Sequence, residues 1–268
     1  MRAALAFALV AGVLSAGVGA ADSRMQSSCI ALAGMPEALQ LAEFGAPLAA
    51  ATVRIRFLGH ASFALETAGG LLAVTDYTGF IGNPMVVPDA VTMNIAHDTH
   101  FTDPLIPHVL RGWGRFGFPA VVDLDLGDLR IRNVTTDLRG PFGEGGRKDG
   151  NSIFIFEAAG LCIVHLGHLH QIPNPVQYAN IGRVDVVMVP VDGGFTMTQD
   201  AMIDVVGRLH ARVVIPMHWF TLQSLHDFLA KMEGSWVIED RQGPELEVSL
   251  GSLPARPTVV LLTPALFP

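Results

Sequence analysis

From Val53 onward the chain consists of short apolar runs separated by Gly, Pro, Asn and Asp, and this pattern constrains its fold most strongly. Runs of this length between turn-forming residues are typical of β-strands. In the first part of the chain the pattern predicts strands at 53–59, 62–67, 71–77 and 90–97, then hairpins over 120–134 and 151–167. We expect the hairpins to turn at Gly127–Asp128 and Ala158–Gly160.

After residue 184 the pattern changes to strands that alternate with amphipathic helices. Apolar residues recur at helical spacing in the first of these helices, as at Met202, Val205 and Leu209. The predicted elements are strands at 184–191 and 212–218, helices at 198–210 and 222–232, and closing strands at 246–251 and 258–264. A strand-rich half followed by strand–helix units favours two sheets between outer helices, in an α/β fold of one domain.

The first twenty residues have a different composition from the rest of the chain. They contain one Arg, an apolar stretch, and then small residues up to Ala20. This pattern predicts a Sec-type signal peptide over 1–20, and hence a periplasmic or secreted protein, the alternative being an uncleaved N-terminal anchor. Residues 21–51 are Ala-rich, and we expect a weakly helical leader segment that packs on the outside of the domain at 52–268. No later apolar run is long enough to predict a membrane span.

Charge and cysteine content narrow the range of partners. The formal net charge is −8, without long runs of one sign, which argues against a nucleic-acid partner and leaves a small-molecule substrate. An oxidising compartment would permit a disulfide between the two cysteines, Cys29 and Cys162. We expect no disulfide, because Cys162 lies in a predicted buried strand, where a free thiol behaves as a small apolar group.

Histidines gather at the ends of the predicted strands. The segment AHDTHFTD, at 96–103, contains two histidines and two aspartates directly after one apolar run. A lone histidine in such a place is usually a satisfied core or surface residue, but here the feature recurs. Five of the ten histidines lie at or just after a predicted strand: His60, His97, His165, His168 and His218. Side chains at strand ends assemble ligand sites, and imidazole is a common zinc ligand, so the pattern predicts a metal site.

Five segments, taken in order, resemble the metallo-β-lactamase fold superfamily, and more narrowly its L-ascorbate-6-phosphate lactonase-like branch. They are FLGHASFALET (57–67), AHDTHFTD (96–103), GNSIFIFEAAGLCIVHLGHLHQ (150–171), VPVDGGFTMTQDA (189–201) and VVIPMHW (213–219). The resemblance runs from about Val53 to Leu262. It implies a four-layer αβ/βα sandwich with one or two metal ions, usually zinc, at the edge between the sheets.

The metal motifs depart from those of the family. His97 matches the first ligand of the family's His-x-His-x-Asp-His motif, and His100 serves as the second if one residue is inserted. His168 stands where relatives carry a bridging Asp, and His218 matches the last ligand. Neutral imidazole cannot offset the repulsion between two cations as a bridging carboxylate does. We therefore expect one ion, zinc or another divalent transition metal, held by ligands among His97, His100, His168 and His218, with Asp103 as a weaker candidate.

The resemblance also suggests catalytic residues and a reaction. His60 and Asp103 are candidates for passing protons to and from water that the metal activates. Asp76 matches a family acid that orients the metal loop, although a plain turn-forming role is equally compatible with its position. Gly193–Gly194 suits either close approach by a ligand or the start of a helix. The leading hypothesis is an exported hydrolase of an ester, lactone, amide or phosphodiester. The alternative is a descendant that binds a metal or ligand without catalysis.

Overall fold

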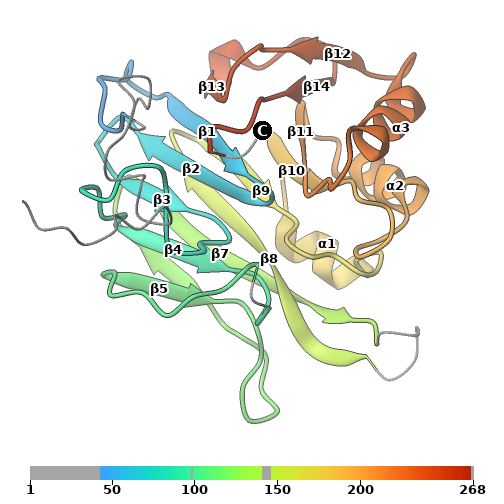
Figure 1. Cartoon of the computed structure of the whole chain (residues 1–268), viewed down its shortest axis with the longest axis horizontal. Helices are drawn as coiled ribbons and strands as arrows, with labels where there is room; N and C mark the ends of the chain where they lie inside the picture. The colour runs from blue at the N-terminus through green and yellow to red at the C-terminus, as the bar shows by residue number, and fades with distance from the viewer. Residues whose placement is uncertain (1–42, 98, 141–145, 267–268) are drawn as a thin grey trace, which may run out of the picture. The chain divides into compact units, whose positions relative to one another are not determined.

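The computed structural model describes residues 43–97, 99–140 and 146–266 (Figure 1). The predicted signal peptide, most of the predicted leader segment and Cys29 lie outside these residues. Within them, Cys162 has a free thiol, and no helix has the length and apolar character that crossing a membrane requires. Residues 43–51 contain no helix, and they run against the first strands, where the backbone N–H of Gly45 donates to Glu66 Oε2 at 2.7 Å.

Within the described residues, one sheet has six strands of three to seven residues, which are mostly buried in its centre and partly exposed at its two edges. Its order is β13 (Glu245–Val248), β1 (Val53–Gly59), β2 (Ser62–Thr67), β3 (Leu72–Val74), β4 (Ala90–Met93) and β5 (His108–Arg111). The strands β13, β1, β2 and β3 pair antiparallel, whereas β3, β4 and β5 are parallel. A tight turn at His60–Ala61 joins β1 to β2.

The second sheet has eight strands and changes from antiparallel to parallel pairing at β9. Its order is β12 (Val237–Asp240), β14 (Thr258–Leu261), β11 (Val213–Met217), β10 (Val186–Pro190), β9 (Leu161–His165), β8 (Arg147–Ala158), β7 (Arg130–Leu138) and β6 (Asp123–Asp125). Because β9, β10, β11 and β14 are parallel, the loops that follow them leave the same edge of the sheet. This edge carries the polar residues described below.

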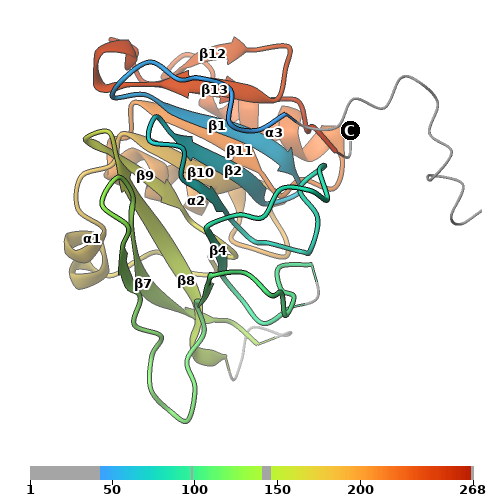
Figure 2. The ribbon, with the colours of Figure 1, turned by 90° about the vertical axis from the view of Figure 1, so that its left-hand side faces the viewer.

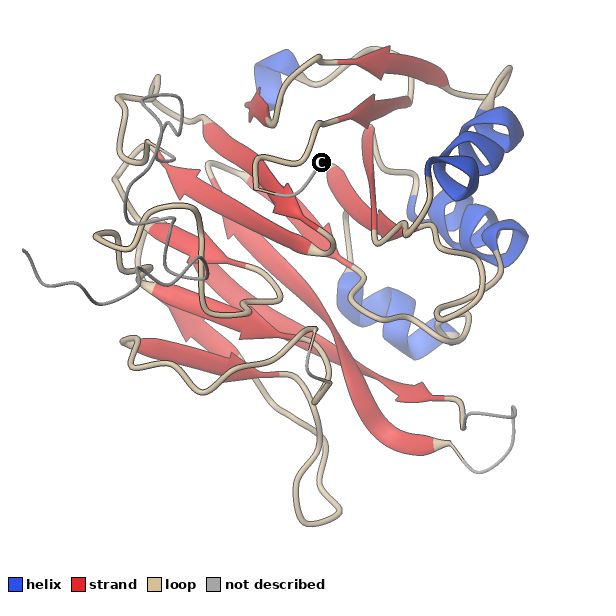
Figure 3. Ribbon diagram, in the orientation of Figure 1, coloured by secondary structure: helices blue, strands red, loops and turns tan. Residues whose placement is uncertain are grey.

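Three helices pack on the outer face of the second sheet (Figure 3). They are α1 (Pro175–Ile181), α2 (Gln199–Leu209) and α3 (Leu222–Met232). A short 3₁₀ helix, η2 (Leu250–Ser252), follows β13. Helix α2 begins after Thr198, whose side chain accepts a hydrogen bond from the N–H of Ala201. It buries Met202, Val205 and Leu209 at helical spacing, so its predicted amphipathic face is the face that contacts the sheet.

The two sheets pack face to face, as Figure 2 shows, and aromatic side chains fill much of the space between them. Phe57 and Phe63 stack with ring centroids 4.6 Å apart, and Phe154 and Phe156 of β8 are also fully buried. Burial of each such side chain stabilises the fold by about 1.5–3 kcal/mol. The outer face of the six-stranded sheet is covered by loops in the part of the chain that the structure describes, with Trp113 and Phe44 packed against it.

The predicted α/β sandwich is confirmed, and the local differences have physical causes. The strand predicted at 90–97 ends at Met93, because the N–H of Asn94 donates to Asp76 Oδ1 instead of to a neighbouring strand. The predicted strand at 71–77 ends at Val74, since Asp76 takes a left-handed conformation with φ +41°. Helix α1 was not predicted, because it is short and buries only Ile181.

Candidate metal centre

The turn between β1 and β2 holds His60 at the edge where the two sheets meet. His60 has a left-handed backbone with φ +54°, and its carbonyl accepts a hydrogen bond from the N–H of His218 at 2.7 Å. His218 directly follows β11 and is also left-handed, with φ +58°. Non-glycine residues in this conformation concentrate at functional sites, where the surrounding structure holds them. The hydrogen bond between them joins a turn of the first sheet to a strand end of the second.

His100 lies in the loop after β4 and is held by a buried carboxylate. Its Nδ1 lies 2.8 Å from Asp76 Oδ2, and both side chains are only 1% exposed. Burial raises the pKa of Asp76, but the neighbouring imidazole of His100 and the hydrogen bonds from His100 and the N–H of Asn94 outweigh burial, so the pKa stays below its usual value. The ionised carboxylate can only accept, and His100 therefore carries its hydrogen on Nδ1.

His218 is held in the same way by Asp192, which follows β10. Its Nδ1 lies 3.0 Å from Asp192 Oδ2. Asp192 also accepts hydrogen bonds from the backbone N–H groups of Gly194 and Thr196 and from the Thr196 hydroxyl. Although burial opposes ionisation, these hydrogen bonds hold the pKa of Asp192 well below its usual range. The sequence prediction gave Asp192 no role, although an Asp between a buried parallel strand and Gly193–Gly194 could have indicated one.

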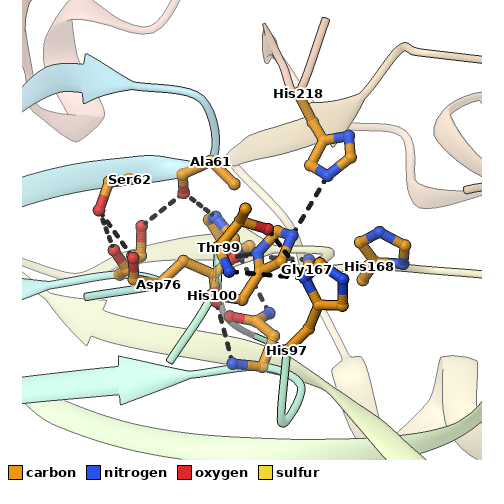
Figure 4. Close-up of polar contacts among 12 residues, drawn as sticks. Ala61, Ser62, Asp76, His97, Thr99, His100, Gly167, His168 and His218 are labelled. Carbon is orange, nitrogen blue, oxygen red and sulfur yellow. Dashed lines mark hydrogen bonds and ion pairs between the residues drawn. The ribbon is translucent and has the colours of Figure 1, made fainter. Parts of the chain in front are cut away.

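In its neutral form each ring, with hydrogen on Nδ1, has a lone pair on Nε2, and the Nε2 atoms of His100 and His218 face each other. They are 3.2 Å apart (Figure 4). Two lone pairs at this distance repel unless a proton or a metal cation lies between them. His60 adds a third nitrogen that could bind a metal, since its Nε2 is buried without a hydrogen-bond partner among the described residues. Burial and the imidazoles of His218 and His100 lower the pKa of His60 to about 3, so its ring is neutral at ordinary pH.

The donor atoms of His60, His100 and His218 lie within 4.8 Å of one another. Three imidazoles are the ligand set of one class of catalytic zinc site, and the carboxylates on His100 and His218 are the partners that orient such ligands. A divalent transition metal therefore suits these residues. The structure brings His100 and His218 together as ligand candidates, and it adds His60, for which the sequence suggested a catalytic role.

His168 lies beside this group but is oriented differently. Its ring centroid is 5.1 Å from that of His100 and 4.9 Å from that of His218, in edge-to-face arrangements. Its Nδ1 is 2.7 Å from Nε2 of His170. Burial, with the neighbouring imidazoles, lowers the pKa of His168 to about 2, and burial with the charge of Arg139 lowers that of His170 to about 4. Both rings are therefore neutral.

The other two predicted site residues make contacts elsewhere. His97 is exposed, with its ring centroid 6.0 Å from that of His100, and its Nδ1 is 3.0 Å from Thr99 Oγ1. Asp103 is 82% exposed and pairs with Arg111. It contacts none of the histidines in the described part of the chain, so the geometry gives no support to the proton-transfer role predicted for Asp103. The loop carries these residues outward because β4 ends four residues before His97.

His165, at the end of β9, is a fully satisfied core histidine. Its Nε2–H donates to the carbonyl of Ala61 at 2.8 Å, and its Nδ1 accepts from the Asn94 amide at 3.1 Å and from the N–H of Gly167 at 3.2 Å. Burial lowers its pKa. His165 therefore fixes the turn that carries His60 and does not itself face the group of three imidazoles.

An apolar cavity of about 200 Å³ adjoins His60. Its lining residues are Leu58, Gly59, His60, Ala61, Ser62, Asp76, Thr78, Phe80, Thr99 and Leu266. No Lys or Arg is among these described residues. On the other side of His60, Phe220 lies with its ring centroid 5.5 Å from that of His60 and 5.1 Å from that of Phe195. Both of these phenylalanines are exposed, so apolar side chains adjoin His60 here as well as in the cavity.

Comparison with known proteins gives consistent results. Residues 54–218 match the family described as the β-lactamase superfamily domain. A UPF0173 metal-dependent hydrolase of Pyrococcus abyssi is 25% identical over 227 residues, covering 73% of this chain and 100% of the relative. A Thermotoga maritima structure, described as a Zn-dependent hydrolase of the metallo-β-lactamase superfamily, is 30% identical with a TM-score of 0.58, covering 78% of this chain and 98% of that one. The metallo hydrolase Igni18 of Ignicoccus hospitalis shares the fold at 18% identity, with a TM-score of 0.50 over 68% of this chain and 91% of its own.

Proposed function

Because the chain belongs to the metallo-β-lactamase superfamily, we propose that it is a metal-dependent hydrolase whose substrate is an uncharged carboxylic ester or lactone. The observation that carries the proposal is the pair of buried carboxylate–imidazole contacts, Asp76–His100 and Asp192–His218, which turn two Nε2 lone pairs toward each other at 3.2 Å. Buried and preorganised imidazoles of this kind are costly to maintain without a cation.

One divalent transition metal, zinc by preference, is the proposed cofactor, with His60, His100 and His218 as its ligands. When bound, such an ion lowers the pKa of water and polarises a carbonyl oxygen. Asp76 and Asp192 hold hydrogen on Nδ1 of His100 and His218, which leaves Nε2 of each ring free to bind. His60 is fixed by the turn between β1 and β2, and its left-handed backbone is held there by the hydrogen bond from His218. The absence of a bridging carboxylate among these three ligands favours one ion over two.

The apolar surroundings support a neutral substrate. The cavity beside His60 accommodates an apolar substituent next to the metal site, and Phe220 offers a second apolar surface. Stable binding of a phosphodiester would need cationic or N–H groups directed at its oxygens. The cavity lining contains no cationic side chain among the described residues, so a carboxylic ester or lactone is favoured over a phosphodiester.

Two finer assignments form part of the proposal. Membership of the L-ascorbate-6-phosphate lactonase-like branch is supported by the order of the five motifs, and hydrolysis of simple lactones would test it. Export to the periplasm is supported by the signal-like pattern of residues 1–20. Cell fractionation of the full chain, compared with a variant that lacks residues 2–20, would test export.

The central experiment measures metal content and turnover together. We expect one equivalent of zinc by ICP-MS on protein purified without a His tag, and zinc-dependent hydrolysis of p-nitrophenyl esters that exceeds hydrolysis of bis-p-nitrophenyl phosphate. His100→Ala and His218→Ala should lose zinc and activity, whereas His226→Ala, an exposed histidine on α3, should keep both. Two equivalents of zinc would contradict the single-ion site. Zinc binding without turnover of any ester or lactone would favour a non-catalytic binding protein.

A further inference from the structure

The hydrogen bond between His168 and His170 determines what His168 can offer to the metal site. Nδ1 of His168 and Nε2 of His170 are 2.7 Å apart, so one of these nitrogens donates a hydrogen and the other accepts it. In a neutral imidazole only one nitrogen carries hydrogen. The direction of this bond therefore fixes whether the second nitrogen of His168 is a lone-pair donor to a metal or an N–H group.

The backbone of Arg139 sets that direction. Its N–H donates to Nδ1 of His170 at 3.1 Å, so this nitrogen has a lone pair and the hydrogen of His170 is on Nε2. The Nε2–H of His170 then donates to Nδ1 of His168, and the hydrogen of His168 is on its own Nε2. Arg139 is itself anchored, because its guanidinium donates to the carbonyls of Gly194 and Thr196 in the loop that carries Asp192.

The arrangement is the reverse of that at His100 and His218. Those two rings donate from Nδ1 to carboxylates and present lone pairs on Nε2, whereas His168 accepts at Nδ1 and presents an N–H on Nε2. This Nε2 has no hydrogen-bond partner within the described residues. The ring centroid of His168 is 5.1 Å from that of His100 and 4.9 Å from that of His218, and Figure 4 shows His168 beside these two ligand candidates.

We propose that His168 is a hydrogen-bond donor to the carbonyl oxygen of the bound substrate and not a metal ligand, and that His170 is the positioning residue that fixes this role. The proposal rests on the proposed function, because it assigns the donor to a substrate carbonyl. A preorganised donor aimed at an oxygen that gains negative charge during attack lowers the barrier to hydrolysis. His168, predicted from the sequence as a ligand, takes instead the place of an oxyanion donor.

Variants of the zinc-loaded full-length protein test the assignment. His168→Ala should keep one equivalent of zinc while kcat toward p-nitrophenyl acetate falls about 10²–10³-fold, the range for loss of an oxyanion donor. His168→Gln should recover part of that loss, since its amide can donate. His226→Ala is the control for the removal of an imidazole. Loss of zinc in His168→Ala would overturn the proposal, because a ligand and a donor differ in this measurement.

The position of the hydrogen can be read without any turnover. In a long-range ¹H–¹⁵N correlation spectrum of the zinc-loaded protein, we expect His168 to show hydrogen on Nε2, and His170→Ala to shift it toward a mixture of both forms without loss of zinc. Hydrogen on Nδ1 of His168 in the wild type would overturn the proposal. If the wild type hydrolyses no ester or lactone, the proposed function fails, while the spectrum and the zinc content still decide between donor and ligand.

Discussion

Asp192 is the residue on which the second half of the site depends. It accepts hydrogen bonds from the N–H groups of Gly194, Phe195 and Thr196, from the Thr196 hydroxyl, and from His218 Nδ1. A carboxylate with five donors is ionised and immobile, so it fixes both the loop before α2 and the orientation of the imidazole. The loop and the ligand are therefore coupled through one side chain.

Replacing Asp192 by Asn should separate charge from shape. The amide keeps the size of the carboxylate. Its NH₂ group, however, cannot accept the hydrogen bonds that Asp192 Oδ2 accepts from His218 Nδ1–H and the Thr196 hydroxyl. We expect zinc affinity to fall about 10–100-fold, as for loss of a carboxylate partner of a ligand. The free energy of unfolding should fall by about 1–3 kcal/mol. Chelator competition and urea unfolding measure the two effects. Asp204→Asn, on the exposed side of α2, is the control, and unchanged zinc affinity in Asp192→Asn would exclude the orienting role.

His165 gives the protein a pH dependence whose sign follows from its burial. Burial lowers its pKa in the folded state, whereas in the unfolded chain the pKa is about 6.5. Below about pH 6.5 the unfolded chain binds a proton that the folded protein does not, so the free energy of unfolding falls as the pH falls. Above that pH the contribution is fully present.

We therefore expect the metal-free protein to be less stable at pH 5.5 than at pH 7.5 in urea unfolding, and the difference to be smaller in His165→Gln. The amide of Gln can still donate to the carbonyl of Ala61, and the variant lacks the titrating group. The change of stability with pH is the informative quantity, because a loss of stability that is equal at both pH values leaves it unchanged. An identical slope in wild type and variant would show that His165 is not responsible.

At the scale of elements, the site is built from loop segments that follow the ends of strands. The loop after β9 must pass close to the end of β4, and Gly167 makes this possible. It has φ +62°, and a Cβ built there would lie 2.0 Å from Asn94 Nδ2. Asn94 also donates to the carbonyl of Ser152 and to Nδ1 of His165, so it cannot move aside cheaply.

Two glycine substitutions should have opposite effects on stability, because an added Cβ clashes at Gly167 and meets nothing at Gly207. Gly167→Ala should destabilise the protein by about 1–3 kcal/mol, since it adds a clash to a strained conformation. Gly207→Ala, within α2, meets nothing within 4 Å and should stabilise by about 0.5–1 kcal/mol through helix propensity. Thermal unfolding of the two variants beside the wild type measures both. A stable Gly167→Ala would mean that the loop after β9 can take another path.

The helices with a clear apolar periodicity were predicted from the sequence, whereas strand β5 and the end of β4 were not. Helices α2 and α3 carry a cap residue and a buried stripe, Met202–Leu209 and Leu225–Met232, and both were predicted within one residue of their bounds. The strand β5 was missed because all four of its residues are half-buried, without an apolar face. The end of β4 was placed too late because Asn94 bonds to Asp76, a partner eighteen residues away, which no local pattern encodes.

At the scale of the whole molecule, the sequence located the site but not its internal division of roles. The strand-end pattern pointed to His218, and the family motif, with one residue inserted, pointed to His100. The roles of His60 and His168, and the existence of Asp192 as a partner, depend on which ring nitrogen meets which neighbour across the two sheets. That is a property of tertiary contact. His97 and Asp103 show the same limit, because sequence proximity to His100 did not turn their side chains inward.

The proposed metal would join the two sheets, because His60 and His100 belong to loops of the six-stranded sheet and His218 to the eight-stranded sheet. An ion that binds only the folded protein stabilises it by about 2.7 kcal/mol at a free concentration of one hundred times Kd. For a domain of this size that corresponds to a rise in Tm of about 5–10 °C.

We expect this rise in Tm, measured by calorimetry, when zinc is added to EDTA-treated protein. His218→Ala should show little or no rise, whereas His226→Ala should respond as the wild type does. An equal rise in His218→Ala would place the stabilising ion elsewhere, and no rise in the wild type would mean that the three imidazoles do not hold a metal between the sheets.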